Sequence, residues 1–145
     1  MVNGTVSTPS GPTKNAWELL THGFQLSGML QAYSALPLNI TSGVTTVQGT
    51  AGRPIVDGNF IERNAGVGSA FFTTSLRVSR SFRLGGGAHA EGLLEVFNLT
   101  NHRNDLTRNG NFGAGAYPTN PSPTFNQITA VGDPRSLQLG VRFRF

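Results

Sequence analysis

The chain has no cysteine, few charged residues and no long apolar run, and each absence excludes a class of protein. Without a thiol it forms neither a disulfide framework nor a thiolate metal site. Charged residues make up 12% of the chain, about half of the ~25% that is usual in soluble domains. No stretch approaches the ~20 apolar residues of a membrane helix. The composition therefore argues against both an ordinary soluble domain and a helical membrane protein.

The first residues, MVNGTVSTPSGPTKNAW, lack the features of a signal peptide. No basic region precedes an apolar run in this segment. If the protein reaches an outer membrane, we expect its export signal on a part of the polypeptide outside these 145 residues. The sequence is then expected to be a piece of a longer chain.

Small polar residues and aromatic residues are abundant. The chain contains 19 glycines and 10 phenylalanines, together with many serines, threonines and asparagines. This mixture is typical of strands that are apolar on one face and wet on the other. Alternation with a period of two indicates where such strands lie.

The net charge of +4 and the sequence pI of about 10.7 would by themselves suggest a nucleic-acid-binding protein. We nevertheless expect no nucleic-acid partner, because the arginines are scattered along the chain rather than gathered into a patch. Four of them, Arg77, Arg83, Arg142 and Arg144, alternate with apolar residues inside predicted strands. That placement favours the polar lumen of a barrel.

The clearest strand is predicted at 136–145, which contains the phrase LQLGVRFRF. Successive side chains of a strand point to opposite faces. One face of this strand is therefore apolar and the other polar: Leu137, Leu139, Val141, Phe143 and Phe145 against Gln138, Gly140, Arg142 and Arg144. A helix would mix the two sets of side chains.

A second strand is predicted at 71–84, in FFTTSLRVSRSFRL. Its polar face carries Arg77 and Arg83, while phenylalanine, leucine and valine alternate on the other face. Arg80 is the exception, because it falls on the apolar face. An arginine facing lipid is unfavourable by up to ~2–4 kcal/mol at the membrane midplane and by much less near an interface. No feature of the sequence explains Arg80 beyond a neighbouring group or a position at the rim.

The glycines at 85–87 predict a tight hairpin turn that leads into a third strand at 88–99. One face of that strand carries Glu91 and Glu95. We expect these carboxylates to form ion pairs across the ladder with an arginine of the preceding strand, Arg77 or Arg83.

A fourth strand is predicted at 24–36, where Pro37 limits its continuation. Two short segments come before it. The phrase AWELL at 16–20 fits either a short helix or the end of a strand, and THG at 21–23 is expected to be a second tight turn.

Two long segments, 40–69 and 100–134, are rich in glycine, proline, asparagine and threonine and show no strong periodicity. Loops of that length are rare in compact soluble domains. A transmembrane barrel, in contrast, has short periplasmic turns and long outer loops. The sequence therefore predicts an all-β fold: an antiparallel meander of about four to five strands, part of a transmembrane β-barrel, with two long loops.

Three phrases carry a family likeness: LRVSRSFRLGGG, then EVFNLTNHRN, then GDPRSLQLGVRFRF. In this order they resemble the C-terminal barrel segments of TonB-dependent receptors, most of all the Oar-like group, and the likeness covers about residues 22–145. It implies a bacterial outer-membrane location, contact with outer-membrane lipid, and a non-enzymatic place in the wall of a transporter. The charged residues facing the lumen would be Arg77, Arg83, Glu91, Glu95, Arg142 and Arg144.

The resemblance also implies an assembly signal in the last strand, recognised by the barrel-insertion machinery. Its residues would be Leu139, Val141, Phe143 and Phe145, and the alternative is that these side chains only form the lipid-facing side of the strand. Receptors of this type have about 22 strands. The remainder of the barrel, or further copies of the chain, must therefore complete the wall. Contact with TonB is expected only through parts outside this sequence, and the substrate is not indicated.

No pattern indicates catalysis, a cofactor or a metal. His22, His89 and His102 lack the spacing of metal ligands. The glycines at 85–87 lack the Lys-Ser/Thr pair of a phosphate-binding loop. We therefore expect the chain to be no enzyme and to hold neither a cofactor nor a metal ion.

Two other functions stay open. The chain is either a structural β-protein that self-assembles through open strand edges, or a soluble β-sandwich binding module whose apolar faces pack together in water. A defined multimer would favour the first, and solubility without detergent the second.

Overall fold

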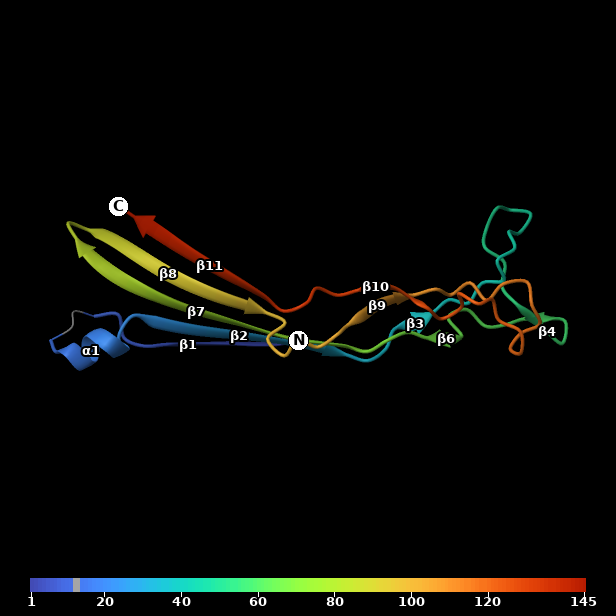
Figure 1. The fold of residues 1–145 in the computed structure, drawn as a ribbon, viewed down its shortest axis with the longest axis horizontal. Helices are drawn as coiled ribbons and strands as arrows, with labels where there is room; N and C mark the ends of the chain where they lie inside the picture. Colours follow the sequence, from blue (N-terminus) through green and yellow to red (C-terminus); the bar gives the residue numbers. More distant parts are fainter. Residues whose placement is uncertain (12–13) are drawn as a thin grey trace. The chain divides into compact units, whose positions relative to one another are not determined.

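A computed structural model describes residues 1–11 and 14–145. By their contacts these residues divide into two units (Figure 1). The first, here called the sheet unit, consists of Met1–Ala32, Phe72–His102 and Asp133–Phe145. The second, here called the loop unit, consists of Tyr33–Phe71 and Arg103–Gly132.

A five-stranded antiparallel sheet forms the sheet unit. Its strands are hydrogen-bonded in the order β1-β2-β7-β8-β11, and neighbouring strands run in opposite directions in Figure 1. Their bounds are β1 Val2–Ser7, β2 Phe24–Tyr33, β7 Phe71–Gly85, β8 Ala88–Phe97 and β11 Ser136–Arg144. Each strand pairs with the strand of this sheet that precedes it in the chain, so the predicted all-β antiparallel meander is confirmed.

The strand bounds agree with the predictions at some ends and not at others. β7 and β11 each lie within one residue of the predicted segments. β8 ends at Phe97 rather than at 99, because Asn98 has a φ of +47° and leaves the extended conformation. β2 ends at Tyr33 rather than at 36, and Pro37 begins a separate short strand.

β1 was not predicted, because a strand with only two large apolar residues, Val2 and Val6, gives a weak alternation. It pairs antiparallel with β2, and Val2 and Val6 lie opposite Leu30 and Leu26. These valines therefore extend the apolar face of β2 by one strand.

The predicted turn at 21–23 is confirmed at His22 and Gly23, whereas Thr21 is the last residue of a helix. The connection between β1 and β2 includes the helix α1, Ala16–Thr21, so AWELL is helical. Among the described residues, no helix is both long and apolar enough to span a membrane. Gly23 then joins α1 to β2 with a φ of +76°, and a Cβ there would lie 2.7 Å from the carbonyl oxygen of Ser81. This close approach requires glycine.

The predicted turn between β7 and β8 is confirmed. Gly85, Gly86 and Gly87 all have positive φ, at 92°, 62° and 89°. This conformation is easily reached only by glycine. The turn sets the register of the hairpin, in which Arg77 lies opposite Glu95 and Arg80 opposite Gly92.

The register places alternate residues of β7, β8 and β11 in rows across the sheet. Val78, Leu94 and Leu139 form one such row, and Phe82, Ala90 and Phe143 form another. Side chains alternate between the faces of a sheet. The even-numbered positions of β7 and β8 and the odd-numbered positions of β11 therefore share one face. Phe24 of β2 lies under the guanidinium of Arg80, so this apolar face also includes Phe24, Leu26 and Leu30 of β2 and, through the β1–β2 register, Val2 and Val6.

The two segments predicted as long loops, 40–69 and 100–134, are long connections between strands of the sheet, and they contain short strands that the sequence did not predict. Each pairs antiparallel with a partner inside the loop unit: β3 Pro37–Leu38 with β6 Gly66–Val67, β4 Ile55–Val56 with β5 Asn59–Phe60, and β9 Asp105–Arg108 with β10 Ile128–Val131. Strands of two to four residues are too short to show periodicity in a sequence.

An aromatic cluster forms the core of the loop unit. Phe112 is 1% exposed, and its ring contacts Tyr117 and Phe125 at centroid distances of 4.9 and 5.1 Å. Its backbone is held as well, because the Phe112 amide donates to the Thr41 carbonyl at 2.8 Å and its carbonyl accepts from Ser122 at 2.6 Å. The long segments therefore pack on one another rather than remaining separate loops.

Replacing Phe112 by alanine tests this core. We expect Phe112→Ala to destabilise the loop unit by about 3–5 kcal/mol, because it removes a fully buried ring. Hydrogen exchange of the Phe112 and Ser122 amides measures the loss. The matched control is Val47→Ala, because Val47 is fully exposed, and it should change protection by less than ~0.5 kcal/mol. Equal effects of the two substitutions would contradict a core at Phe112.

Candidate functional site

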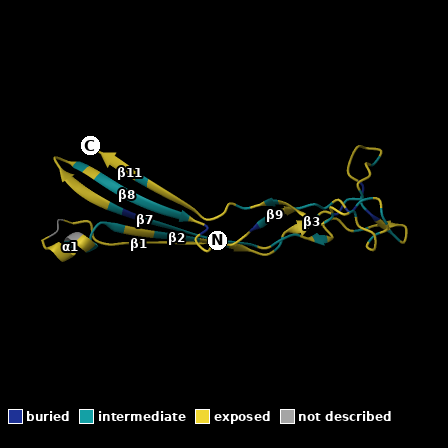
Figure 2. Ribbon diagram, viewed as in Figure 1, coloured by how far each residue is buried: buried dark blue, intermediate teal, exposed yellow. Residues whose placement is uncertain are grey.

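The apolar face of the sheet is exposed rather than packed. On β11, Leu139 is 74% exposed, Val141 68% and Phe143 58%. Among the described residues the buried hydrophobic side chains are Ile40 and Phe112, and both belong to the loop unit. Figure 2 shows β11 and β1 coloured mostly as exposed and β8 as intermediate. Soluble monomers rarely expose so continuous an apolar surface, so this face indicates a contact with an apolar environment.

Aromatic residues mark the two ends of this face. Phe72 and Phe82 lie ten residues apart on β7, which is roughly 34 Å along a strand. Phe82 shares a row with Phe143 across Ala90. At the other end, the ring of Phe72 contacts His102 edge-on at 5.8 Å. The surface between these two ends is formed by aliphatic side chains, apart from Thr74, Arg80 and glycines.

The opposite face carries ion pairs between neighbouring strands. Arg77 lies 3.5 Å from Glu95, as the sequence predicted. Glu91 pairs instead with Arg142 of β11, also at 3.5 Å. The sequence prediction missed this second pair because it considered only the preceding strand as a neighbour of Glu91. The register places both pairs directly across the ladder.

The predicted alternative partner, Arg83, forms no ion pair with a carboxylate within the part of the chain that the structure describes. It lies opposite His89, and on the far side of β8 His89 lies opposite Arg144. The Nη2 of Arg83 donates to the carbonyl oxygen of Ser10 at 2.9 Å. The register thus places all six charged residues predicted for the lumen on one face. Near the glycine turn, Arg83 and Arg144 lie on either side of His89.

Both outer strands of the sheet have one open edge among the described residues. β1 is hydrogen-bonded only to β2, and β11 only to β8. An open edge presents unpaired N–H and C=O groups to its surroundings. In a hydrocarbon environment these groups must be paired, since no water is there to bond them. The sheet therefore requires a further strand at each edge if it lies in a membrane.

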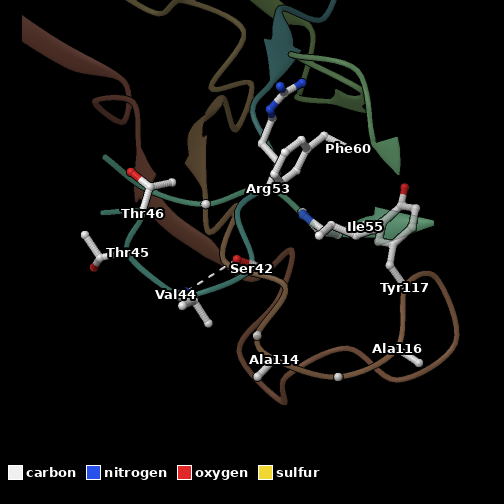
Figure 3. A pocket seen from close by; sticks show the side chains of 14 residues that line it. Ser42, Val44, Thr45, Thr46, Arg53, Ile55, Phe60, Ala114, Ala116 and Tyr117 are labelled. Atoms are coloured by element: carbon white, nitrogen blue, oxygen red, sulfur yellow. Dashed lines mark hydrogen bonds between the residues drawn. The ribbon is translucent and has the colours of Figure 1, made fainter. Parts of the chain in front are cut away.

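A separate cavity of about 630 Å³ lies in the loop unit (Figure 3). Figure 3 shows Arg53 and Phe60 on one side of it and Tyr117 and the backbone near Ala116 on another. The guanidinium carbon of Arg53 lies 5.4 Å from the Phe60 ring centroid, and its Nη1 donates to the Ile61 carbonyl at 2.5 Å. The size suits a small ligand. The sequence held no signal for this cavity, because its walls come from two distant segments.

The described residues do not bring metal ligands together. In the part of the chain that the structure describes, no three His, Asp or Glu side chains form a group able to hold a metal ion. His89 lies on the polar face of the sheet, between Arg83 and Arg144.

Comparison of the chain with protein-family models, with curated proteins and with solved structures found no match. The resemblance to TonB-dependent receptors therefore stays a prediction from the sequence. The sheet unit has one apolar face, one face with ion pairs and two open edges.

The ion pairs allow a test of how wet the polar face is. Glu91 and Arg142 are 23% and 59% exposed in their side chains. For a solvated pair we expect a double-mutant cycle with Glu91→Gln and Arg142→Gln to give a coupling of about 0.2–1 kcal/mol. High salt should reduce this coupling by screening. A coupling above ~2 kcal/mol that does not change with salt would show instead that the pair is shielded from water.

Proposed function

We propose that the sheet unit forms part of the wall of an outer-membrane β-barrel of the TonB-dependent receptor type, and that the chain is not itself an enzyme. One observation carries the proposal. A continuous exposed apolar face lies back to back with an ion-paired polar face, in a sheet whose edges are open. Lipid on one side and water on the other satisfy both faces at once.

Strand length supports this wall. β2, β8 and β11 have 10, 10 and 9 residues, and a transmembrane strand needs about 9–11. The span between Phe72 and Phe82 is roughly 34 Å along β7. With a tilt of about 40° this becomes about 26 Å across the membrane, close to the ~25 Å apolar band of such barrels. Phe82 and Phe143 then lie at one membrane interface, and Phe72 lies at the other.

The orientation follows from the connections. The glycine turn at 85–87 is short, whereas both connections of the loop unit are long. In outer-membrane barrels short turns face the periplasm and long loops face outward. The connection containing α1 lies at the periplasmic end in this arrangement and is longer than most periplasmic turns. In such a barrel, long connections of this kind lie on the outer side, where a transporter first meets its substrate.

The partners follow from the two faces and the edges. The apolar face contacts outer-membrane lipid, and the edges of β1 and β11 pair with the remainder of a barrel. Contact with TonB belongs to other parts of such a receptor. The resemblance further assigns Leu139, Val141, Phe143 and Phe145 to recognition by the barrel-insertion machinery, and these side chains are exposed.

Self-assembly of several copies through the same edges is the second candidate, and the open edges of β1 and β11 favour it equally. A soluble β-sandwich is less well supported, because the apolar residues of β11 remain exposed in the sheet unit. Cell fractionation with an antibody against 100–134 separates the candidates. A large polypeptide in the outer-membrane fraction supports the receptor wall, a multimer of the 15.4 kDa chain supports self-assembly, and a soluble monomer contradicts both.

A pair of arginine substitutions on adjacent residues of β11 tests the lipid-facing assignment. Leu139 shares a row with Val78, between the two aromatic positions of β7. Leu139→Arg should destabilise the membrane-inserted protein by about 2–4 kcal/mol, because it places a charge in the hydrocarbon. Gln138→Arg is the matched control on the opposite face and should have little effect. Urea unfolding in bilayers measures both. If Gln138→Arg is the more damaging change, the two faces are assigned the wrong way round.

A further inference from the structure

Arg80 is the one charged residue on the apolar face of the strands, and the structure gives it a defined environment. Its guanidinium carbon lies 4.7 Å from the ring centroid of Phe24 and 4.8 Å from that of Phe82. Both rings therefore contribute cation–π attraction. The residue is half-buried rather than extended into solvent. Two aromatic rings thus hold the positive charge at a fixed place on an otherwise apolar surface.

The position of Arg80 is close to one end of the apolar band. It lies two residues from Phe82 on β7, which is roughly 7 Å along the strand. Phe82 and Phe143 belong to the aromatic row nearest the glycine turn. The side chain lies over Phe82 and Phe24, so its charge is directed to the aromatic end of the face. An arginine there is far less unfavourable than one at the midplane.

A shallow apolar groove of about 590 Å³ begins beside Arg80. Its floor lies at Gly92, which is directly opposite Arg80 on one side and Val141 on the other. A Cβ on Gly92 would meet no atom within 4 Å, so the missing side chain leaves open space. From this floor the groove extends away from the glycine turn, to Val78, Leu94 and Leu139.

The groove and the Arg80 guanidinium together are complementary to the two parts of an amphipathic ligand. The guanidinium lies at the end nearer the glycine turn, and the apolar groove leads from it toward the middle of the face. Arg80 is the one charged residue that the strands of the sheet place on this face, and they place no carboxylate there. An anionic group with an attached hydrocarbon chain is complementary to both parts, and arginine binds phosphate oxygens with paired N–H donors.

We propose that Arg80, Phe24, Phe82 and the groove over Gly92 form a binding site for an anionic phospholipid. Its phosphate lies against the Arg80 guanidinium, and one acyl chain lies in the groove. This inference rests on the proposed membrane location, since it names the lipid that the apolar face contacts. With the glycine turn at the periplasm, the lipid belongs to the inner leaflet of the outer membrane. The site gives Arg80 the role that the sequence left unexplained.

The test compares two lipids that differ only in the headgroup. The full chain is purified in dodecyl maltoside micelles, and dioleoylphosphatidylglycerol or dioleoylglycerol is added. Native mass spectrometry then counts the lipid retained on each chain. We expect about fivefold greater retention of the phospholipid, the contribution of one arginine beside an anionic headgroup. Equal retention of the two lipids by the unaltered chain would overturn the proposal.

Four variants identify the residues responsible. Arg80→Gln should abolish the preference for the phospholipid, and Arg80→Lys should keep most of it, because it keeps the charge. Arg83→Gln is the matched control, since Arg83 is exposed on the opposite face of the same strand, and it should keep the full preference. Gly92→Leu fills the groove and should lower retention of both lipids. If Arg80→Gln and Arg83→Gln lose the phospholipid preference equally, the net charge of the protein attracts the lipid, and the proposed site is overturned.

Folding and membrane location are controlled separately. Circular dichroism confirms that each variant keeps its strands, and retention in Arg80→Lys shows that a loss in Arg80→Gln comes from the charge. The measurement reports headgroup preference rather than cellular location, so its result does not depend on the fraction in which the protein is found. Cell fractionation can therefore contradict the receptor wall while the lipid site holds. The lipid preference can equally be absent from a protein that fractionates with the outer membrane.

Discussion

The antiparallel register of β7, β8 and β11 is the constraint on which the rest of the sheet unit depends. Because the side-chain period of a strand is two, a slip of one residue would move every apolar side chain to the other face. The glycine turn at 85–87 fixes the β7–β8 register, and β11 then follows β8 without a bulge. The two faces, the ion pairs and the row of Phe82 and Phe143 all follow from that alignment.

The same register decides which unfavourable features the sheet tolerates. The ion pairs Arg77–Glu95 and Arg142–Glu91 form because their positions are directly opposite. Arg80 falls on the apolar face, where its directly opposite neighbour on β8 is Gly92.

Exposing the Leu139 and Val141 side chains to water is unfavourable by about 1.5–3 kcal/mol for each side chain left unburied. An apolar environment on that face removes this cost.

The sequence was sufficient to predict β7, β8 and β11, because long alternation and a glycine turn are local signals. It was not sufficient for β1, where glycine and small polar residues weaken the alternation, or for the short strands of the loop unit. The pair Glu91–Arg142 and the cavity beside Arg53 join segments far apart in the chain. Contacts of this kind depend on sheet order and loop packing, which a local pattern does not encode. The place of Arg80 was predicted, but its contact with Phe24 on β2 was not.

The central claim is that the two faces of the sheet meet lipid and water respectively. These 145 residues contain no cysteine, so single cysteines at successive positions of β11 each give one spin label within them, and any cysteine elsewhere in the native polypeptide is first replaced by serine. Accessibility to oxygen and to a water-soluble nickel chelate is then measured along the strand. The account predicts alternation, with oxygen favoured at Leu139, Val141 and Phe143 and nickel favoured at Gln138 and Arg142. Uniform access of the nickel chelate along β11 would contradict it.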